Sequence, residues 1–201
     1  MWTAIQGRGP LPQERSPFAH ALPREGPLGC VDLTGFRSGM RALAGTVMVL
    51  TTVHAGRRSG LTATAVCSLS AEPPRLLACV NQRGASYAAF AASRRLAVNV
   101  LAEGQFAIAE VFAGQGGPGS DRFALGVWTE GEAEGLPVLE GAVSTFECRT
   151  AEMIDALTHA ILIADIMAVR MSPDLRPLLY CDGRFTAPAD QLFDPRYGHQ
   201  F

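Results

Sequence analysis

Lysine is absent from this 201-residue sequence, and all 17 basic residues are arginines. Without lysine the protein has no Schiff-base lysine, which excludes covalent pyridoxal phosphate chemistry, and it has no P-loop lysine for nucleotide hydrolysis. Charged residues make up 18% of the chain and the formal net charge is −2. Nucleic acids bind through accumulated basic side chains, so this charge balance predicts no nucleic-acid partner.

Long hydrophobic runs and paired cysteines are also missing. No run approaches the ~20 apolar residues of a membrane span, and residues 1–8 hold no apolar stretch typical of a signal peptide. The five cysteines are an odd number without a CxxC pair: Cys30, Cys67, Cys79, Cys148 and Cys181. Most lie in apolar runs, which favours small buried side chains over zinc ligands, so we expect no metal site. Reduced buried cysteines suit the cytoplasm, and the lack of a long apolar run predicts no membrane partner.

The remaining composition predicts one compact domain with a short segment at each end. With 48% hydrophobic residues, a chain of this length can bury roughly 70% of its unfolded surface without disulfides or metals. Residues 1–30 are rich in Pro, Gly and Arg and show no period, so we expect a flexible arm there. The domain is expected over residues 31–188, followed by a tail over residues 189–201.

Hydrophobic periodicity predicts many short strands and a few helices. Thr34 is the expected N-cap of an amphipathic helix that carries Phe36, Met40 and Leu43. A turn at residues 55–60 is expected to join the first two strands in a hairpin. Strands are expected at 47–53, 61–69, 76–80, 96–101, 143–148, 160–169 and 178–181, and further helices at 86–91 and 105–112. Strands and helices do not alternate regularly, which argues against a doubly wound parallel sheet and favours a mainly β fold with helices, a closed antiparallel barrel.

The stretch most informative about function is residues 60–74, GLTATAVCSLSAEPP. Hydroxyl and small residues alternate along it, which by itself is typical of a half-exposed strand face. Small side chains also let a ligand approach the backbone closely, and hydroxyls and free N–H groups can hold a phosphate without lysine. A second polar group follows the next expected strand, where Ser86 is expected to cap a helix whose N-terminus could seat a phosphate.

These segments, in this order, resemble the flavin reductase-like family. The resemblance rests on residues 60–90, GLTATAVCSLSAEPPRLLACVNQRGASYAAF, and continues through residues 96–101, 121–123, 135–139, 146–148 and 177–180. It covers roughly residues 33–187 and implies a dimeric FMN-binding split barrel. It also implies an NAD(P)H:flavin oxidoreductase, with FMN or FAD as flavin and NADH or NADPH as co-substrate, that supplies reduced flavin to a partner flavin-dependent monooxygenase.

The resemblance also assigns site residues by position. The residues that it places along the flavin ring and ribityl chain are Thr62, Ala63, Thr64 and Ser68. Those that it places on the phosphate side are Asn81, Arg83, Ser86 and Tyr87. Arg83 would supply the positive charge and the bidentate geometry for the phosphate. His159 resembles the histidine that in the family lies near the flavin and nicotinamide rings, and we expect it to place the nicotinamide.

The sequence departs from the family at two places. Ala65 follows Thr64 where the family often has a second hydroxyl or amide residue, so we expect weaker flavin retention. Leu157, Thr158 and His159 stand where the family usually shows Gly-Asp-His. A carboxylate beside the histidine would raise its pKa and fix its orientation, whereas the hydroxyl of Thr158 does so only weakly.

Two other functions remain open at this point. One is a non-catalytic flavin- or haem-binding split barrel, which the two departures favour. The other is an enzyme similar to pyridoxamine phosphate oxidase on a related barrel, which the pattern of residues 60–74 favours less. An assay of NADH oxidation with FMN or FAD distinguishes catalytic from non-catalytic members.

Overall fold

A computed structural model of the protein describes residues 32–115, 117 and 120–189. The expected arm, residues 1–30, lies outside the described residues, and so does the expected tail apart from Ala189. The chain divides into two compact units, Met1–Arg37 and Ser38–Phe201. Of the first unit the structure describes residues 32–37, which contain the start of helix α1 (Leu33–Arg41).

The start of α1 differs from the sequence-based expectation. The helix already includes Thr34, the expected N-cap. The carboxylate of Asp32 accepts a hydrogen bond of 2.6 Å from the backbone N–H of Gly35, which is the bond that an N-cap residue makes. The prediction of Thr34 as N-cap is therefore wrong, because Asp32 offers a charged acceptor two positions earlier.

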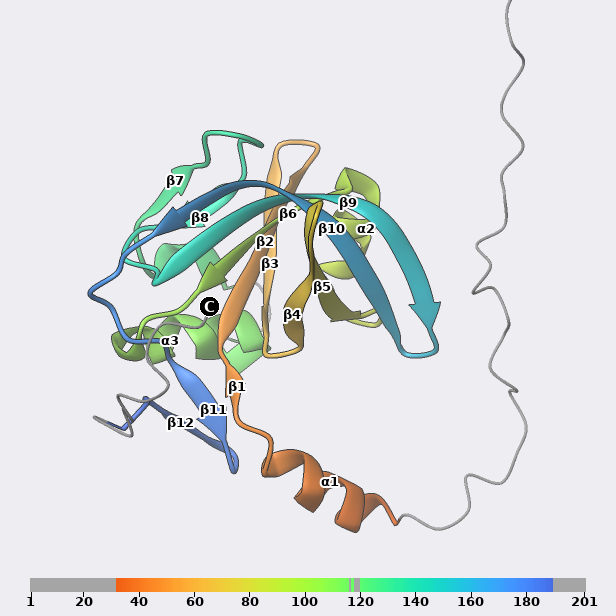
Figure 1. The fold of residues 1–201 in the computed structure, drawn as a ribbon, viewed down its shortest axis with the longest axis vertical. Coiled ribbons are helices and arrows are strands. Elements are labelled where there is room, and N and C mark those ends of the chain that lie inside the picture. Colours follow the sequence, from red (N-terminus) through yellow and green to blue (C-terminus); the bar gives the residue numbers. More distant parts are fainter. Residues whose placement is uncertain (1–31, 116, 118–119, 190–201) are drawn as a thin grey trace, which may run out of the picture. The chain divides into compact units, whose positions relative to one another are not determined.

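The second unit is built on a seven-stranded sheet with the order β3–β2–β6–β9–β10–β5–β4 (Figure 1). The strands are β2 (Met48–His54), β3 (Arg57–Ala63), β4 (Val66–Ala71), β5 (Pro74–Asn81), β6 (Arg95–Val100), β9 (Ser144–Ala156) and β10 (His159–Met171). All six neighbouring pairs are antiparallel. The expectation of a mainly β fold with antiparallel strands is thereby confirmed, and so is the hairpin of β2 and β3.

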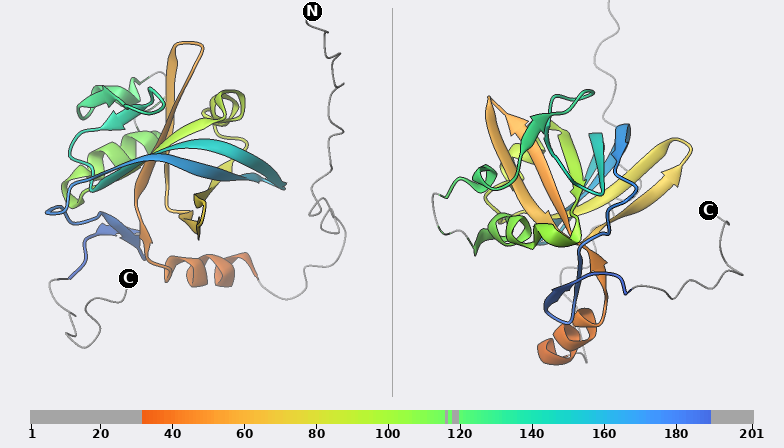
Figure 2. Two further views of the ribbon diagram at one scale, coloured as in Figure 1. Left: turned by 45° about the horizontal axis from the view of Figure 1, so that its top comes forward. Right: turned by 90° about the vertical axis from the view of Figure 1, so that its left-hand side faces the viewer.

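The segment 61–69 was expected to form one strand, and it forms parts of two. Strand β3 ends at Ala63 and β4 begins at Val66. These strands are the two edges of the sheet: β3 pairs with β2 and β4 with β5 (Figure 2). Small and polar residues continue the alternation across Thr64 and Ala65, so periodicity does not reveal the break. Among the described residues no ladder joins β3 to β4, and closure of the barrel stays a prediction.

The two faces of the sheet pack against different helices. On one face the main core includes Leu50, Leu96 and Leu162, together with Phe90 from helix α2 (Tyr87–Ser93). On the other face Val49 packs with residues of helix α3 (Phe106–Glu110) and the π-helical turn η2 (Val111–Gln115). The expected helix over residues 105–112 is thus present as a series of shorter helical segments.

Two small sheets complete the second unit. The first has the order β1–β11–β12 and consists of β1 (Gly45–Thr46), β11 (Leu179–Cys181) and β12 (Arg184–Thr186). The second pairs β7 (Trp128–Glu130) with β8 (Pro137–Leu139). The short 3₁₀ turns are η1 (Glu103–Gln105) and η3 (Arg122–Ala124). No helix in the described part of the chain is long and apolar enough to cross a membrane.

A buried amide fixes the second small sheet to the large one. The side chain of Asn99 on β6 is fully buried and donates to the carbonyl oxygen of Val49 on β2 at 3.0 Å. Its side-chain oxygen accepts from the backbone N–H of Leu139 on β8 at 2.9 Å. A buried amide needs such partners to offset its lost hydration. Asn99 therefore joins β2, β6 and β8.

Candidate functional site

The end of β3 forms one wall of a cavity with a volume of about 400 Å³. Thr62, Ala63 and Thr64 all line it. Because Thr62 is paired with Val49 on β2, its side chain points toward α3, where its hydroxyl donates to the carbonyl oxygen of Ala109 at 2.7 Å. Three of the four residues expected along a flavin ring therefore lie at one cavity.

The other walls come from α3, η2 and the hairpin of β11 and β12. The remaining lining residues are Val47, Glu110, Ala113, Gln115, Tyr180, Gly183, Arg184 and Phe185. The rings of Tyr180 and Phe185 meet edge to face with their centroids 5.4 Å apart. Aromatic side chains, a carboxylate and a guanidinium around one hollow suit a planar ring with polar edges.

Ser68, the fourth residue expected at the ring, lies on the other edge strand. It is exposed on β4 opposite Leu76 of β5, and it does not belong to the residues that line the cavity. A register shift between Ser68 and Ser70 interrupts the pairing of β4 with β5. The structure therefore places Ser68 and the β3 residues Thr62 and Ala63 on opposite edges of the sheet.

A turn after β5 presents Arg83. The side-chain oxygen of Asn81 accepts from the backbone N–H of Arg83 at 2.9 Å, which forms an Asx turn. Arg83 is exposed, and within residues 32–115, 117 and 120–189 its guanidinium has no hydrogen bond or ion pair. A free guanidinium on a fixed turn can bind an anion in bidentate fashion.

Ser86 precedes α2 as expected, but its side chain makes no capping hydrogen bond. Its hydroxyl donates instead to the carbonyl oxygen of Gly60 at 2.7 Å, and Arg122 donates to the same oxygen at 2.9 Å. This carbonyl lies on an edge strand, where donors from outside the sheet must satisfy it. The expected capping role of Ser86 is therefore wrong, while Tyr87 beside it packs partly buried against the main core.

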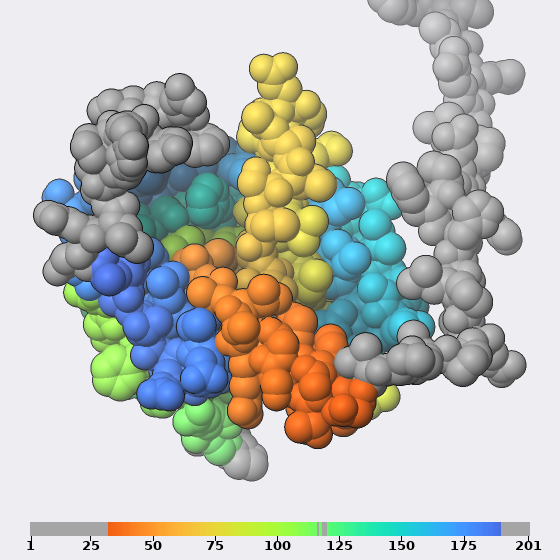
Figure 3. Space-filling model, turned by 60° about the horizontal axis from the view of Figure 1, so that its bottom comes forward, coloured from red at the N-terminus to blue at the C-terminus, as the bar shows by residue number. Residues whose placement is uncertain are grey.

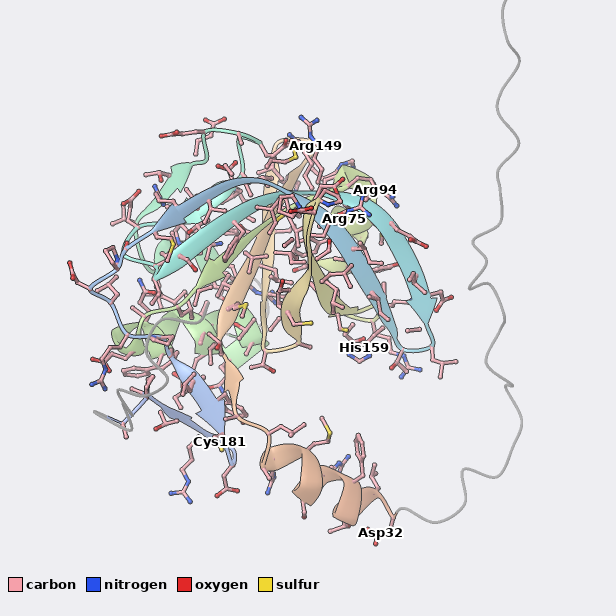
Figure 4. All side chains as sticks on the ribbon, in the orientation of Figure 1. Asp32, Arg75, Arg94, Arg149, His159 and Cys181 are labelled. Atoms are coloured by element: carbon pink, nitrogen blue, oxygen red, sulfur yellow. The ribbon has the colours of Figure 1, made fainter. Side chains whose placement is uncertain are left out.

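His159 is the first residue of β10, directly after the turn from β9 (Figure 4). It lies opposite Asn81 in the pairing of β10 with β5, so the two side chains share one face of the sheet. The hydroxyl of Thr158 lies 2.9 Å from Nδ1 of His159. This contact occupies one ring nitrogen and leaves Nε2 for a ligand. The structure thus brings together two expected site residues that are far apart in the sequence.

Burial strongly changes the chemistry of one cysteine near the centre of the sheet. Cys148 on β9 is fully buried, and this burial, with a smaller contribution from the nearby carboxylate of Glu147, raises the pKa of its thiol from 9.0 to about 12. The thiolate is therefore not available as a nucleophile near neutral pH.

Residues 40–189 match the family model for the flavin reductase like domain. This chain belongs to the flavin reductase-like family. The FMN reductase (NADH) RutF of Variovorax paradoxus is 38% identical over 166 residues, which cover 83% of this chain and 91% of that relative. The resemblance identified from the sequence is thereby confirmed.

Solved structures agree with this membership in the flavin reductase-like family. The NADH:FAD oxidoreductase SgcE6 of Streptomyces globisporus, in complex with NAD and FAD fragments, is 28% identical with a TM-score of 0.75, covering 81% of this chain and 96% of that chain. BorF, the flavin reductase component of a bacterial two-component tryptophan halogenase, is 27% identical with a TM-score of 0.73. That match covers 80% of this chain and 100% of BorF.

Sequence reasoning missed the part of this flavin reductase-like domain that faces β3 across the cavity. Glu110, Tyr180 and Arg184 stand on that side. Residues 177–180 carry part of the family resemblance, but β12 spans three residues, too few for a periodic pattern. The pairing of β1 with β11, which joins distant parts of the chain, brings this hairpin to the cavity.

Proposed function

We propose that this protein is an NADH-dependent flavin reductase that reduces FMN or FAD and supplies the reduced flavin to a partner monooxygenase. The observation that carries the proposal is the match of residues 40–189 to the flavin reductase like domain. The name of the RutF relative supports FMN and NADH, and the SgcE6 structure holds NAD and FAD fragments. These two relatives therefore support NADH over NADPH as the reductant.

The cavity beside Thr62, Ala63 and Thr64 is the place where this chain would hold the flavin ring. Its volume of about 400 Å³ lies within the ~300–1,000 Å³ usual for ligand pockets. Strand β3 is an edge strand, so the outward N–H and C=O groups near Thr62 can face the polar edge of a ring. When bound, the flavin supplies the ring that accepts hydride, while the protein orients it and excludes water.

The turn of Asn81 and Arg83 would bind the phosphate of the flavin. The exposed guanidinium of Arg83 provides charge, and the Asx turn fixes the backbone that carries it. The amide nitrogen of Asn81 is a further donor. Ser68, Ser86 and Tyr87 stay predicted contacts, and the hydroxyl of Ser86 can still accept a hydrogen bond while it donates to Gly60.

His159 would position the nicotinamide of NADH. Nδ1 is engaged by the hydroxyl of Thr158, so Nε2 is the nitrogen that contacts the substrate. Hydride transfer needs the two rings at close distance and correct orientation, and a side chain that holds the nicotinamide contributes through this geometry. A hydroxyl orients the imidazole less firmly than a carboxylate would.

The test is an assay of NADH oxidation at 340 nm with purified protein and either FMN or FAD. We expect flavin-dependent oxidation, faster with NADH than with NADPH. Heat-denatured protein is the control for direct reaction of NADH with flavin. Binding of flavin or haem without NADH oxidation would overturn the proposal in favour of a non-catalytic split barrel, and binding of neither flavin nor haem would overturn both.

We propose further that the fold is an FMN-binding split barrel, in which β3 and β4 approach each other beside the cofactor. Two residues, Thr64 and Ala65, connect these edge strands, which keeps their adjoining ends close. Small side chains at this connection leave room for a ligand between the strands. Nuclear Overhauser contacts between the backbones of β3 and β4 are the expected observation, and their absence in the flavin-bound protein would contradict closure.

We also propose a homodimer in which a second copy covers the sheet face opposite the main core. Strands β4, β5, β9 and β10 carry partly exposed apolar side chains on this face, and Figure 3 shows β4 standing out beside β9 and β10. They are Cys67, Leu77, Cys79, Ile154, Ile161 and Ile163. His159 and Asn81 form the next pair along this face, so a second copy would also reach the site.

Light scattering tests the homodimer at micromolar concentration. We expect a dimer for the natural protein and a monomer for Ile161→Glu, because a charge would be buried at the interface. Val127→Glu is the matched control: Val127 is exposed and lies outside this face, so this variant should stay dimeric. A stable monomer of the natural protein would contradict the proposal.

The expected compartment is the cytoplasm, where the proposed oxygenase partner also has access to NADH. The described cysteines, Cys67, Cys79, Cys148 and Cys181, are free thiols, which is typical of a reducing environment. Coupling is testable with an oxygenase from the same cell: its product should form with this protein, NADH and flavin. Product formation that is independent of this protein would contradict the partnership.

A further inference from the structure

Gln82 ties two loops of the proposed site together. It stands between Asn81 and Arg83, and its backbone N–H donates to the carbonyl oxygen of Thr158 at 3.0 Å. Its side-chain nitrogen donates to Oδ1 of Asp155 at 3.1 Å and to the carbonyl oxygen of His159 at 3.1 Å. All three bonds end on the turn between β9 and β10 or on its flanking residues.

Apart from the ladder of β9 with β10, which begins at the pair of Ala156 and His159, this turn has few stabilising contacts. Leu157 adopts a left-handed backbone conformation with φ of 64°, which is unfavourable for a residue with a side chain. Its side chain is 68% exposed, so packing does not stabilise the turn. The ladder of β10 with β5 ends at the pair of His159 and Asn81. The bonds from Gln82 therefore connect β5 to the turn one residue beyond the end of the ladder of β5 with β10. They lie next to Leu157, whose backbone strain has to be offset.

We propose that Gln82 is a positioning residue for His159. Its bonds hold the carbonyl groups of Thr158 and His159, which are the two residues whose side chains meet at Nδ1. Gln82 thereby supports the orientation that the hydroxyl of Thr158 maintains only weakly. It also fixes the imidazole relative to the turn that carries Arg83. The proposed nicotinamide contact and the proposed phosphate contact are therefore held at a fixed position relative to each other. This inference rests on the proposed function of His159.

Three variants isolate the side chain of Gln82. Gln82→Ala removes both side-chain bonds and keeps the backbone bond to Thr158. Gln82→Glu keeps the size, removes both donors and places a second carboxylate beside Asp155, so it should be the more harmful. In the double variant of Gln82→Glu and Asp155→Asn, the new amide at position 155 can donate to the new carboxylate at position 82. This restores one bond with donor and acceptor exchanged, and it should recover part of the activity lost in Gln82→Glu. Gln105→Ala is the matched control, because Gln105 also bridges two segments and is not part of the site.

The kinetic result expected for Gln82→Ala is a loss of about two- to five-fold in the rate of flavin reduction or in NADH affinity, no larger than the loss in His159→Asn. Flavin affinity and the urea midpoint should change no more than in Gln105→Ala. Because Gln82 acts through His159, Gln82→Ala should add no further loss to His159→Asn. Additive losses, or an unchanged reduction step in Gln82→Ala, would overturn the proposal.

A second measurement separates this proposal from the proposed function. The imidazole resonance of His159, assigned by its disappearance in His159→Asn, can be followed by NMR without NADH. Gln82→Ala should shift this resonance and speed amide exchange in the turn, whereas Gln105→Ala should do neither. If the natural protein does not oxidise NADH but these changes occur, the proposed function fails and the link from Gln82 to His159 stands. If neither change occurs, the link itself is wrong.

Discussion

The hydroxyl of Ser86 donates a hydrogen bond to the carbonyl oxygen of Gly60, 2.7 Å away. This bond attaches the start of α2 to the outer edge of β3, the strand that continues into Thr62 and Thr64 at the cavity. Phe112 of η2 also packs closely over the Cα atom of Gly60, where a side chain would otherwise lie. The position of the cavity wall therefore depends on contacts at Gly60 as well as on the ladder to β2.

Gly60→Ala should destabilise the protein. A Cβ atom at this position would lie 2.6 Å from Cε1 of Phe112 and 2.8 Å from the carbonyl oxygen of Leu50, and the backbone oxygen cannot move aside easily. We expect a loss of about 1–3 kcal/mol in the free energy of unfolding, measured with urea. Gly39→Ala is the control, since a Cβ there meets nothing within 4 Å. Equal stability of both variants would show that the ring of Phe112 moves aside for the added Cβ atom without a measurable loss of stability.

Arg83→Ala should weaken flavin binding through the phosphate. Loss of a charge-assisted bond should cost ~1.5–3 kcal/mol in binding free energy for FMN. Riboflavin lacks the phosphate, so its affinity should fall much less. Flavin fluorescence titration measures both. Arg57→Ala, which removes an exposed arginine on the hairpin of β2 and β3, should leave both affinities unchanged. Equal losses for FMN and riboflavin would mean that the phosphate binds elsewhere.

His159→Asn should slow hydride transfer or raise the KM for NADH and leave flavin affinity unchanged. The expected loss is modest, about two- to ten-fold, because Thr158 orients the native imidazole only weakly. Thr158→Asp places a carboxylate beside Nδ1 and should improve use of NADH. Stopped-flow reduction of bound flavin isolates the hydride step from product release. If neither substitution alters the reduction rate or NADH affinity, His159 has a structural role only.

Cys148 should make the folded protein less stable at high pH. Its thiol pKa is raised from 9.0 to about 12 by burial, so the folded protein keeps a proton that the unfolded chain releases above pH 9. The contribution of the Cys148 thiol to the free energy of unfolding is fully present below pH 9. It is lost as the pH rises toward 12, by up to about 1.4 kcal/mol per pH unit. Urea midpoints between pH 8 and 11 measure it.

Cys148→Ala is the control for this pH dependence. It lowers stability at every pH, because a buried side chain is shortened, but it should lack the steeper decline above pH 9. Iodoacetamide at pH 8.5 should leave the buried Cys148 unmodified until urea is added. Rapid alkylation of Cys148 in the folded protein would contradict its burial.

Local sequence patterns were sufficient to predict much of the secondary structure and to identify the family. The β-branched run of β2 and the glycine turn after it predict the hairpin with β3, since these signals lie within a few residues of each other. The ordered segments of residues 60–90 identify the family because their chemistry depends on residue type and local spacing. The polar residues Asn81 and Arg83 are recognisable at the end of a strand for the same reason.

The tertiary structure alone decided which of these residues meet. The chain breaks between β3 and β4 at Thr64 and Ala65, and these strands lie at opposite edges of the sheet. Small residues alternate with hydroxyl residues across this break, so the sequence pattern does not reveal where the strand ends. The pairing of His159 with Asn81 depends on β10 lying beside β5, and Ser86 bonds to Gly60 instead of capping its helix. Such contacts depend on sheet order and on unsatisfied backbone groups in distant segments, which no local pattern encodes.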